Sequence, residues 1–176
     1  TPQEGVNKPM GKGQGIYPGR VVWEQDFAAT SWDGKTGHWW EDKNIDQATV
    51  DRMFSQSLQR LTDAKTDKQA WDSLFKFHNK SAGRGSQGFK KGEKIVVKLN
   101  CNADTGKPWD NKGYPSPAVV NTLVRQLIEV AGVPGGAIVP TDPSRKVGDN
   151  IYNMVRSNRG DDYQQVIFEG QNGELA

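Results

Sequence analysis

Two short apolar runs separated by an amphipathic helix pattern constrain the fold of this chain most strongly. The runs are KIVVKLN at 94–100 and GAIVPTD at 136–142. Runs of this kind, rich in β-branched residues, are typical of buried strands. Between them, Ser116 followed by Pro117 is typical of the start of a helix. The order therefore predicts two parallel strands joined by a crossover helix.

The same alternation continues toward the C-terminus. A short helix is expected near 147–156, and YQQVIFE at 163–169 is typical of a third buried strand. The order from about residue 94 is then β-α-β-α-β. We therefore predict an α/β fold with a Rossmann-like parallel sheet, forming an α/β core over residues 93–176.

Residues 1–92 are expected to form an N-terminal arm and a mostly helical extension that packs on this core. The arm, 1–19, holds five glycines and three prolines and no periodic apolar pattern. RVVWEQ at 20–25 is typical of a short strand. Asp46 and Thr66 are the expected N-caps of two helices, the second in a capping-box arrangement.

Charge balance and cysteine content exclude several classes of protein. The chain has 23 Lys+Arg and 21 Asp+Glu. It lacks the basic excess of a dedicated nucleic-acid binder, so we expect no nucleic-acid partner. No apolar run is long enough to span a bilayer, so no transmembrane segment is expected. One cysteine, Cys101, cannot hold an iron–sulfur cluster, and we expect none in this chain.

Ligands of open parallel sheets bind beyond the carboxyl ends of the strands. Two loops should lie there, 100–116 and 141–147. The candidate site residues of these strand ends and loops are Lys98, Asn100, Asn102, Asp142, Ser144 and Arg145.

Each of these residue types suits a particular role. Asp142 and Lys98 are the candidate catalytic residues, because the carboxylate would bind a metal or a hydroxyl and the ammonium would neutralise an anion. The asparagine amides would orient a ligand. Ser144 would cap the next helix, whose N–H groups together with Arg145 would suit a carboxylate or phosphate. The alternative is a solvated loop with asparagine turns and simple helix capping by Asp142 or Ser144.

The segment TGHWWEDK at 36–43 admits two interpretations. Trp40 is a candidate ligand-binding residue, because an aromatic face can stack on a sugar or another flat ligand. We favour an anchor that clamps the N-terminal extension onto the core. Successive side chains of an extended segment point to opposite faces, so one ring would pack inward and the other would be partly exposed along a groove.

The cofactor is unknown from the sequence. His38 and His78 are the only histidines, and no Cys/His spacing supplies a zinc site. Acids such as Glu41 and Asp42 leave a divalent cation open as the cofactor.

Several segments together resemble the domain-of-unknown-function 362 family. KGEKIVVKLNCN, SPAVVNTLVRQLIEVAG and AIVPTDPSR resemble its strand ending in Lys-x-Asn, its Ser-Pro helix and its second strand ending in Asp. The upstream residues, from KGQGIYPGRVVW to AWDSLFKFHN, are similar to the N-terminal extension of exported Bacteroidetes-type members. The resemblance implies an α/β fold without an established activity. Some members lie beside iron–sulfur modules.

The resemblance also bears on completeness and location. Members usually continue well past the point where this sequence stops, so the sheet and the site would be completed by a later segment. A removed export signal would suit Thr1. This favours a periplasmic or cell-surface location, with a cytoplasmic location as the alternative.

Three functional hypotheses follow. The first is a small-molecule or metal-dependent enzyme domain with its site at the strand ends, acting on an unknown small or anionic ligand. The second is a non-catalytic extracytoplasmic module that binds a glycan or peptide through Trp39 or Trp40. The third is an interaction module that docks its arm on a larger assembly. Whether the chain is an enzyme stays open.

Overall fold

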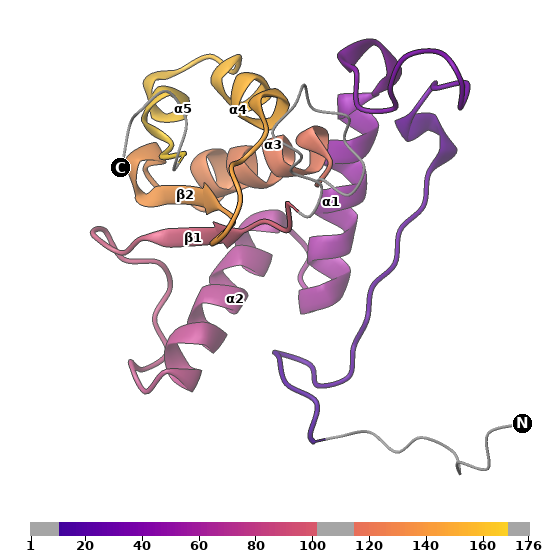
Figure 1. Cartoon of the computed structure of the whole chain (residues 1–176). Helices are drawn as coiled ribbons and strands as arrows, with labels where there is room; N and C mark the ends of the chain where they lie inside the picture. Colours follow the sequence, from indigo (N-terminus) through magenta and orange to yellow (C-terminus); the bar gives the residue numbers. More distant parts are fainter. Residues whose placement is uncertain (1–10, 102–114, 169–176) are drawn as a thin grey trace, which may run out of the picture.

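A computed structural model describes residues 11–101 and 115–168 of the chain (Figure 1). The α-helices and strands are α1 (Gln47–Thr62), α2 (Asp67–Ser81), β1 (Ile95–Lys98), α3 (Pro117–Arg125), β2 (Ile138–Thr141), α4 (Asp149–Arg156) and α5 (Asp161–Gln165). Short 3-10 helices lie at Phe27–Ala29, Asp42–Asn44 and Gly135–Ala137, and a π-helical turn, Gln126–Val130, continues α3. No helix of the described ranges is long and apolar enough to cross a bilayer.

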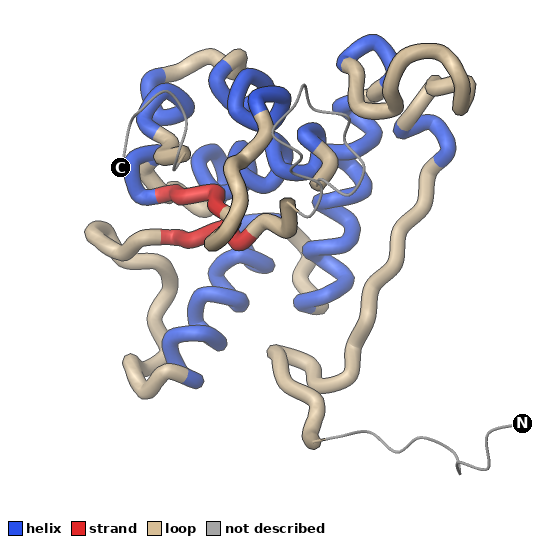
Figure 2. The backbone as a smooth tube through the Cα atoms, viewed as in Figure 1, coloured by secondary structure: helices blue, strands red, loops and turns tan. Residues whose placement is uncertain are grey.

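The two strands pair in parallel, in a register that sets Ile95 opposite Ile138 and Lys98 opposite Thr141. The predicted crossover is confirmed: α3 starts where expected, with the Ser116 hydroxyl accepting from the Val119 N–H at 3.4 Å. Figure 2 shows the strand pair lying against the helices. The core between them contains fully buried side chains from α3, the π-helical turn, β2 and α4, namely Val124, Leu127, Ile138, Ile151 and Val155.

The predicted Rossmann-like β-α-β-α-β sheet is wrong. The sheet has two strands among the described residues; α5 takes up residues 163–165 at the start of the predicted third strand, and residues 166–168 form no strand. Tyr163, which was expected to begin the strand, is a buried residue of that helix. Up to residue 168, where the described chain ends, one backbone hydrogen bond joins the residues after α5 to β2, from Ile167 N–H to Ile138 O at 3.0 Å. An apolar run this short fits a strand or a buried helix end equally well, and tertiary contacts decided.

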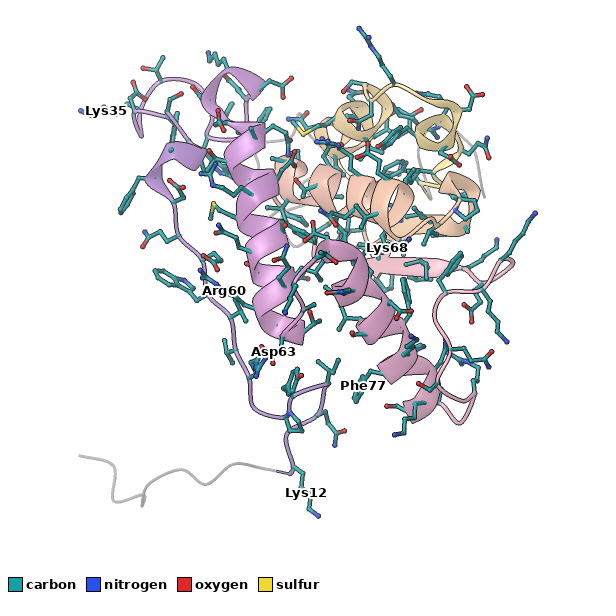
Figure 3. The ribbon with its side chains drawn as sticks, turned by 180° about the vertical axis from the view of Figure 1, so that it is seen from behind. Lys12, Lys35, Arg60, Asp63, Lys68 and Phe77 are labelled. Carbon is teal, nitrogen blue, oxygen red and sulfur yellow. The ribbon has the colours of Figure 1, made fainter. Side chains whose placement is uncertain are left out.

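The arm continues into residues 20–25, which are extended, as expected for a strand, but have no strand partner within the described chain. It lies along α1, held by an Arg60–Glu24 ion pair and by Arg52 to Asp26 at 2.7 Å. Figure 3 shows Arg60 between the arm and α1. Every second side chain of residues 20–25 faces away from α1, and Trp23 among them is 75% exposed.

Both N-caps of the extension are confirmed. The Asp46 carboxylate accepts from the Thr49 N–H at 2.6 Å, and the Thr66 hydroxyl accepts from the Gln69 N–H at 3.3 Å. The α1 helix also contacts α3: the Asp51 carboxylate accepts a hydrogen bond from the Thr122 hydroxyl at 2.6 Å. The division of the chain at residues 92/93 stays a prediction.

A single carboxylate joins three helical segments. Asp67, at the start of α2, accepts from Ser55 at 2.6 Å and from Gln59 at 2.7 Å on α1, and from Gln126 at 2.7 Å on the π-helical turn. Trp71 then donates its indole N–H to the side-chain oxygen, Oε1, of Gln126 at 3.1 Å. Burial of Asp67 opposes its ionisation, but the hydrogen bonds from Gln59, Ser55 and Gln126 outweigh burial and lower the pKa of the carboxyl.

Asp67→Ala should destabilise the fold by about 1–3 kcal/mol, because the two glutamine amides lose their shared acceptor. Chemical unfolding followed by circular dichroism measures the change. Asp72→Ala is the matched control on the same helix, since Asp72 makes only an exposed ion pair with Lys76. An equal loss of unfolding free energy in both variants would contradict the role of Asp67 in joining the three helical segments.

Candidate functional site

The carboxyl ends of β1 and β2 meet at one edge, as the parallel order predicted. Leu99 N–H donates to Thr141 O at 2.7 Å, and Cys101 N–H donates to Asp142 Oδ2 at 2.8 Å. The expected proximity of the Asn100 and Asp142 backbones is therefore confirmed. We call this edge, with Lys98, Asn100, Asp142, Ser144 and Arg145, the strand-end rim; Asn102 lies outside the described residues.

The Asp142 side chain is directed at the backbone. One oxygen accepts from Cys101, and the other accepts from the Ser144 N–H at 2.9 Å and the Ser144 hydroxyl at 3.2 Å. The residue is 9% exposed. The N–H groups of Cys101 and Ser144 lower the pKa of the Asp142 carboxyl to about 2. Such a carboxylate ties the two loops together and is a poor base at neutral pH.

Lys98 is the cation nearest to this carboxylate. Its Nζ lies 4.0 Å from Asp142 Oδ2 and 3.5 Å from Asn100 Oδ1, while 58% of its side chain is exposed. Arg145 is also exposed, and its backbone forms an isolated bridge with Asp142. The rim therefore presents cations and an amide to solvent and keeps its one carboxylate inside.

The expected cap by Ser144 is wrong. The N-cap of α4 is Gly148, which has no side-chain cap bond. The Ser144 hydroxyl is directed back to Asp142 instead. The anion site expected at that helix N-terminus therefore lacks its capping residue.

A metal site is not assembled by the described ranges. Across residues 11–101 and 115–168, no three His, Cys, Asp or Glu side chains gather closely enough to hold an ion. Glu41 is instead paired with Lys43 at 2.7 Å. A divalent cofactor stays a prediction.

Trp40 lies on the wall of a cavity of about 510 Å³. Residues 40–43 form one wall, and one side of α4 forms the other. The residues of this side are Asn150, Asn153 and Met154 of α4 and its C-cap, Ser157. We call this space the Trp40 cavity. Trp40 stacks on His38 with ring centroids 4.9 Å apart and planes 7° apart, which fixes the indole orientation.

Trp39 lines a different cavity, of about 390 Å³, together with apolar α1 residues such as Val50, Met53 and Phe54. The prediction that the two rings point different ways is thus confirmed. Trp40 is partly exposed along its cavity, as predicted, whereas the ring expected to pack inward, Trp39, is half-buried and not fully covered. The segment packs through Trp39 against α1 and presents Trp40 to α4.

Sequence reasoning missed the polar side of α4. Asn150, Asn153 and Ser157 recur at helical spacing opposite the buried Ile151 and Val155. The spacing was visible in the sequence, but polar residues opposite an apolar face are ordinary on a surface helix. Only the contact with residues 40–43 distinguishes this face.

Comparison of the chain with protein-family models, with curated proteins and with solved structures gives no match. The resemblance to the domain-of-unknown-function 362 family therefore stays a prediction.

Asp142→Asn should lower the melting temperature at neutral pH, because an amide nitrogen cannot accept the bond from Cys101 or Ser144. The folded pKa of about 2 lies below the ordinary 3.8. The carboxylate therefore stabilises the fold above pH 3.8, and this contribution is lost as pH falls through about 2. Thermal melts should show the difference from the natural chain shrinking with acid. A pH-independent difference would contradict the assignment.

Proposed function

We propose that the chain binds a neutral polyhydroxylated ligand, of the glycan class, in the Trp40 cavity. One observation carries this proposal: an oriented indole and the amides of Asn150 and Asn153 line the same cavity. This is the combination by which proteins bind sugars, with apolar contact on a ring face and hydrogen bonds at its rim.

The chemistry of the lining suits hydroxyl groups. Each asparagine amide offers a donor and an acceptor, as a sugar hydroxyl does. Met154 adds an adaptable apolar surface beside them. The volume of about 510 Å³ lies within the roughly 300–1,000 Å³ range of small-molecule sites.

Of the two acids that line the cavity, Glu41 and Asp42, the first is already engaged by its own chain. The Glu41 carboxylate is paired with Lys43 at 2.7 Å and accepts from the His38 N–H at 3.2 Å, and these contacts lower the pKa of Glu41. Gly37 permits this arrangement. It has φ +66, and a Cβ there would lie 2.8 Å from a Glu41 carboxylate oxygen.

We rank glycan binding above the enzymatic hypothesis for the strand-end rim. The rim's carboxylate, Asp142, already accepts three hydrogen bonds from its own chain. Binding of an anionic ligand at the rim is the second candidate function. Lys98 at the end of β1 and Arg145 after the end of β2 support it, because both cations are exposed at the same edge. Catalysis there stays a prediction.

Trp40→Ala should weaken binding of a responsive saccharide at least about tenfold, because the indole supplies the stacking surface. Asn153→Ala should weaken it roughly 2- to 10-fold through loss of a hydrogen bond. Isothermal titration with a panel of neutral mono- and oligosaccharides measures both.

Trp39→Ala is the matched control, because the neighbouring ring lines the other cavity. Its affinity for the same saccharide should be unchanged, with circular dichroism confirming the fold of each variant. Saccharide binding that survives Trp40→Ala, or a panel without any binder, would contradict the proposal.

A further inference from the structure

One edge of β1 is open along the described chain. β1 pairs with β2 on one side only, and Leu99 N–H donates to Thr141 O across that pairing. Alternation along a strand then directs the N–H of Val97 toward β2 and the N–H groups of Val96 and Lys98 toward the opposite edge. The Val96 side chain is 64% exposed.

The open edge borders a cavity of about 420 Å³ between β1 and α2. Figure 1 shows α2 on the side of β1 away from β2, and the view from behind in Figure 3 agrees. Apolar side chains of both elements line it, among them Leu74, Phe75 and Ile95. We call it the edge groove. It combines strand donors with room for a side chain.

The edge groove lies in the most basic part of the chain. Residues 79–98 contain one acid, Glu93, and six exposed cations: Lys80, Arg84, Lys90, Lys91, Lys94 and Lys98. The segment therefore carries +5, against +2 for the whole sequence, so the remainder carries −3. Arg84 and Lys94 line the groove itself.

We propose that the edge groove binds an extended acidic segment of a partner polypeptide as a strand added to β1. The N–H groups of Val96 and Lys98 would pair with the backbone of the added strand, as in other cases of strand addition. The apolar pocket would take one alternate side chain, and the surrounding cations would select carboxylates.

Lysines on an open edge also protect it from uncharged strands of other molecules. That protection and the proposed binding have the same physical origin. The cations repel basic segments, and they would lose hydration without gaining a partner beside a neutral segment. An acidic segment gains charge pairing along the same edge. A nucleic acid would satisfy the cations but has no backbone that pairs with the strand donors.

The test uses the full chain and a fluorescein-labelled octapeptide of alternating glutamate and valine, followed by fluorescence anisotropy. Val96→Pro should weaken binding at least about tenfold, because proline removes the N–H at the open edge and leaves the pairing with β2. Val96→Ala is the matched control and should stay within about threefold. Lys94→Glu should weaken binding, and the lysine–valine octapeptide should not bind.

Two results would overturn the proposal. Equal affinity of Val96→Pro and Val96→Ala would exclude strand pairing, as would a single-stranded oligonucleotide whose tight binding is unchanged by Val96→Pro. If Val96→Pro does not fold, amide hydrogen exchange of the natural chain decides: the peptide should slow exchange at Val96 and Lys98. Unchanged exchange at both amides would count against an added strand.

Discussion

The burial of one face of α3 against the two parallel strands is the constraint on which the rest of the structure depends. Two strands cannot hide their own apolar side chains, so the crossover helix must cover them. Val124 of α3 and Leu127 of the following π-helical turn are 0% and 1% exposed, and Ile138 of β2 is 0% exposed. Because the crossover makes both strands run the same way, their carboxyl ends meet and the Asp142 contacts become possible.

The helices that form the two proposed sites are placed by the same packing. The π-helical turn after α3 binds Asp67 of α2 through Gln126, which sets α2 beside the open edge of β1. On the other side of α3, Asn121 accepts from Asn158, just past α4, at 2.6 Å. Neither the Trp40 cavity nor the edge groove is lined by an α3 residue. Their geometry nevertheless depends on this helix.

What could be predicted from the sequence was local or followed from strand direction. The caps at Asp46 and Ser116 act within one helical turn, and the meeting of Asn100 with Asp142 follows from parallel pairing. The prediction of a third strand was wrong at a place where Tyr163 donates a hydrogen bond to Glu129, a contact over 34 residues that no local pattern reveals. The direction of the Asp142 carboxylate likewise depends on an N–H 41 residues earlier. The partners of Trp40 on α4 lie over one hundred residues away, and no local pattern signals such a contact.

The two proposed sites differ in the charges that surround them. The Trp40 cavity is bordered by two acids and one lysine, whereas the edge groove is bordered by two cations, Arg84 and Lys94, and one acid, Glu93. An acidic segment is therefore attracted to the groove and gains nothing at the cavity, since surface charges act mainly within about a Debye length. A neutral glycan is indifferent to both fields and is selected by the indole and the amides. No lining residue is shared, so the two proposed sites do not overlap.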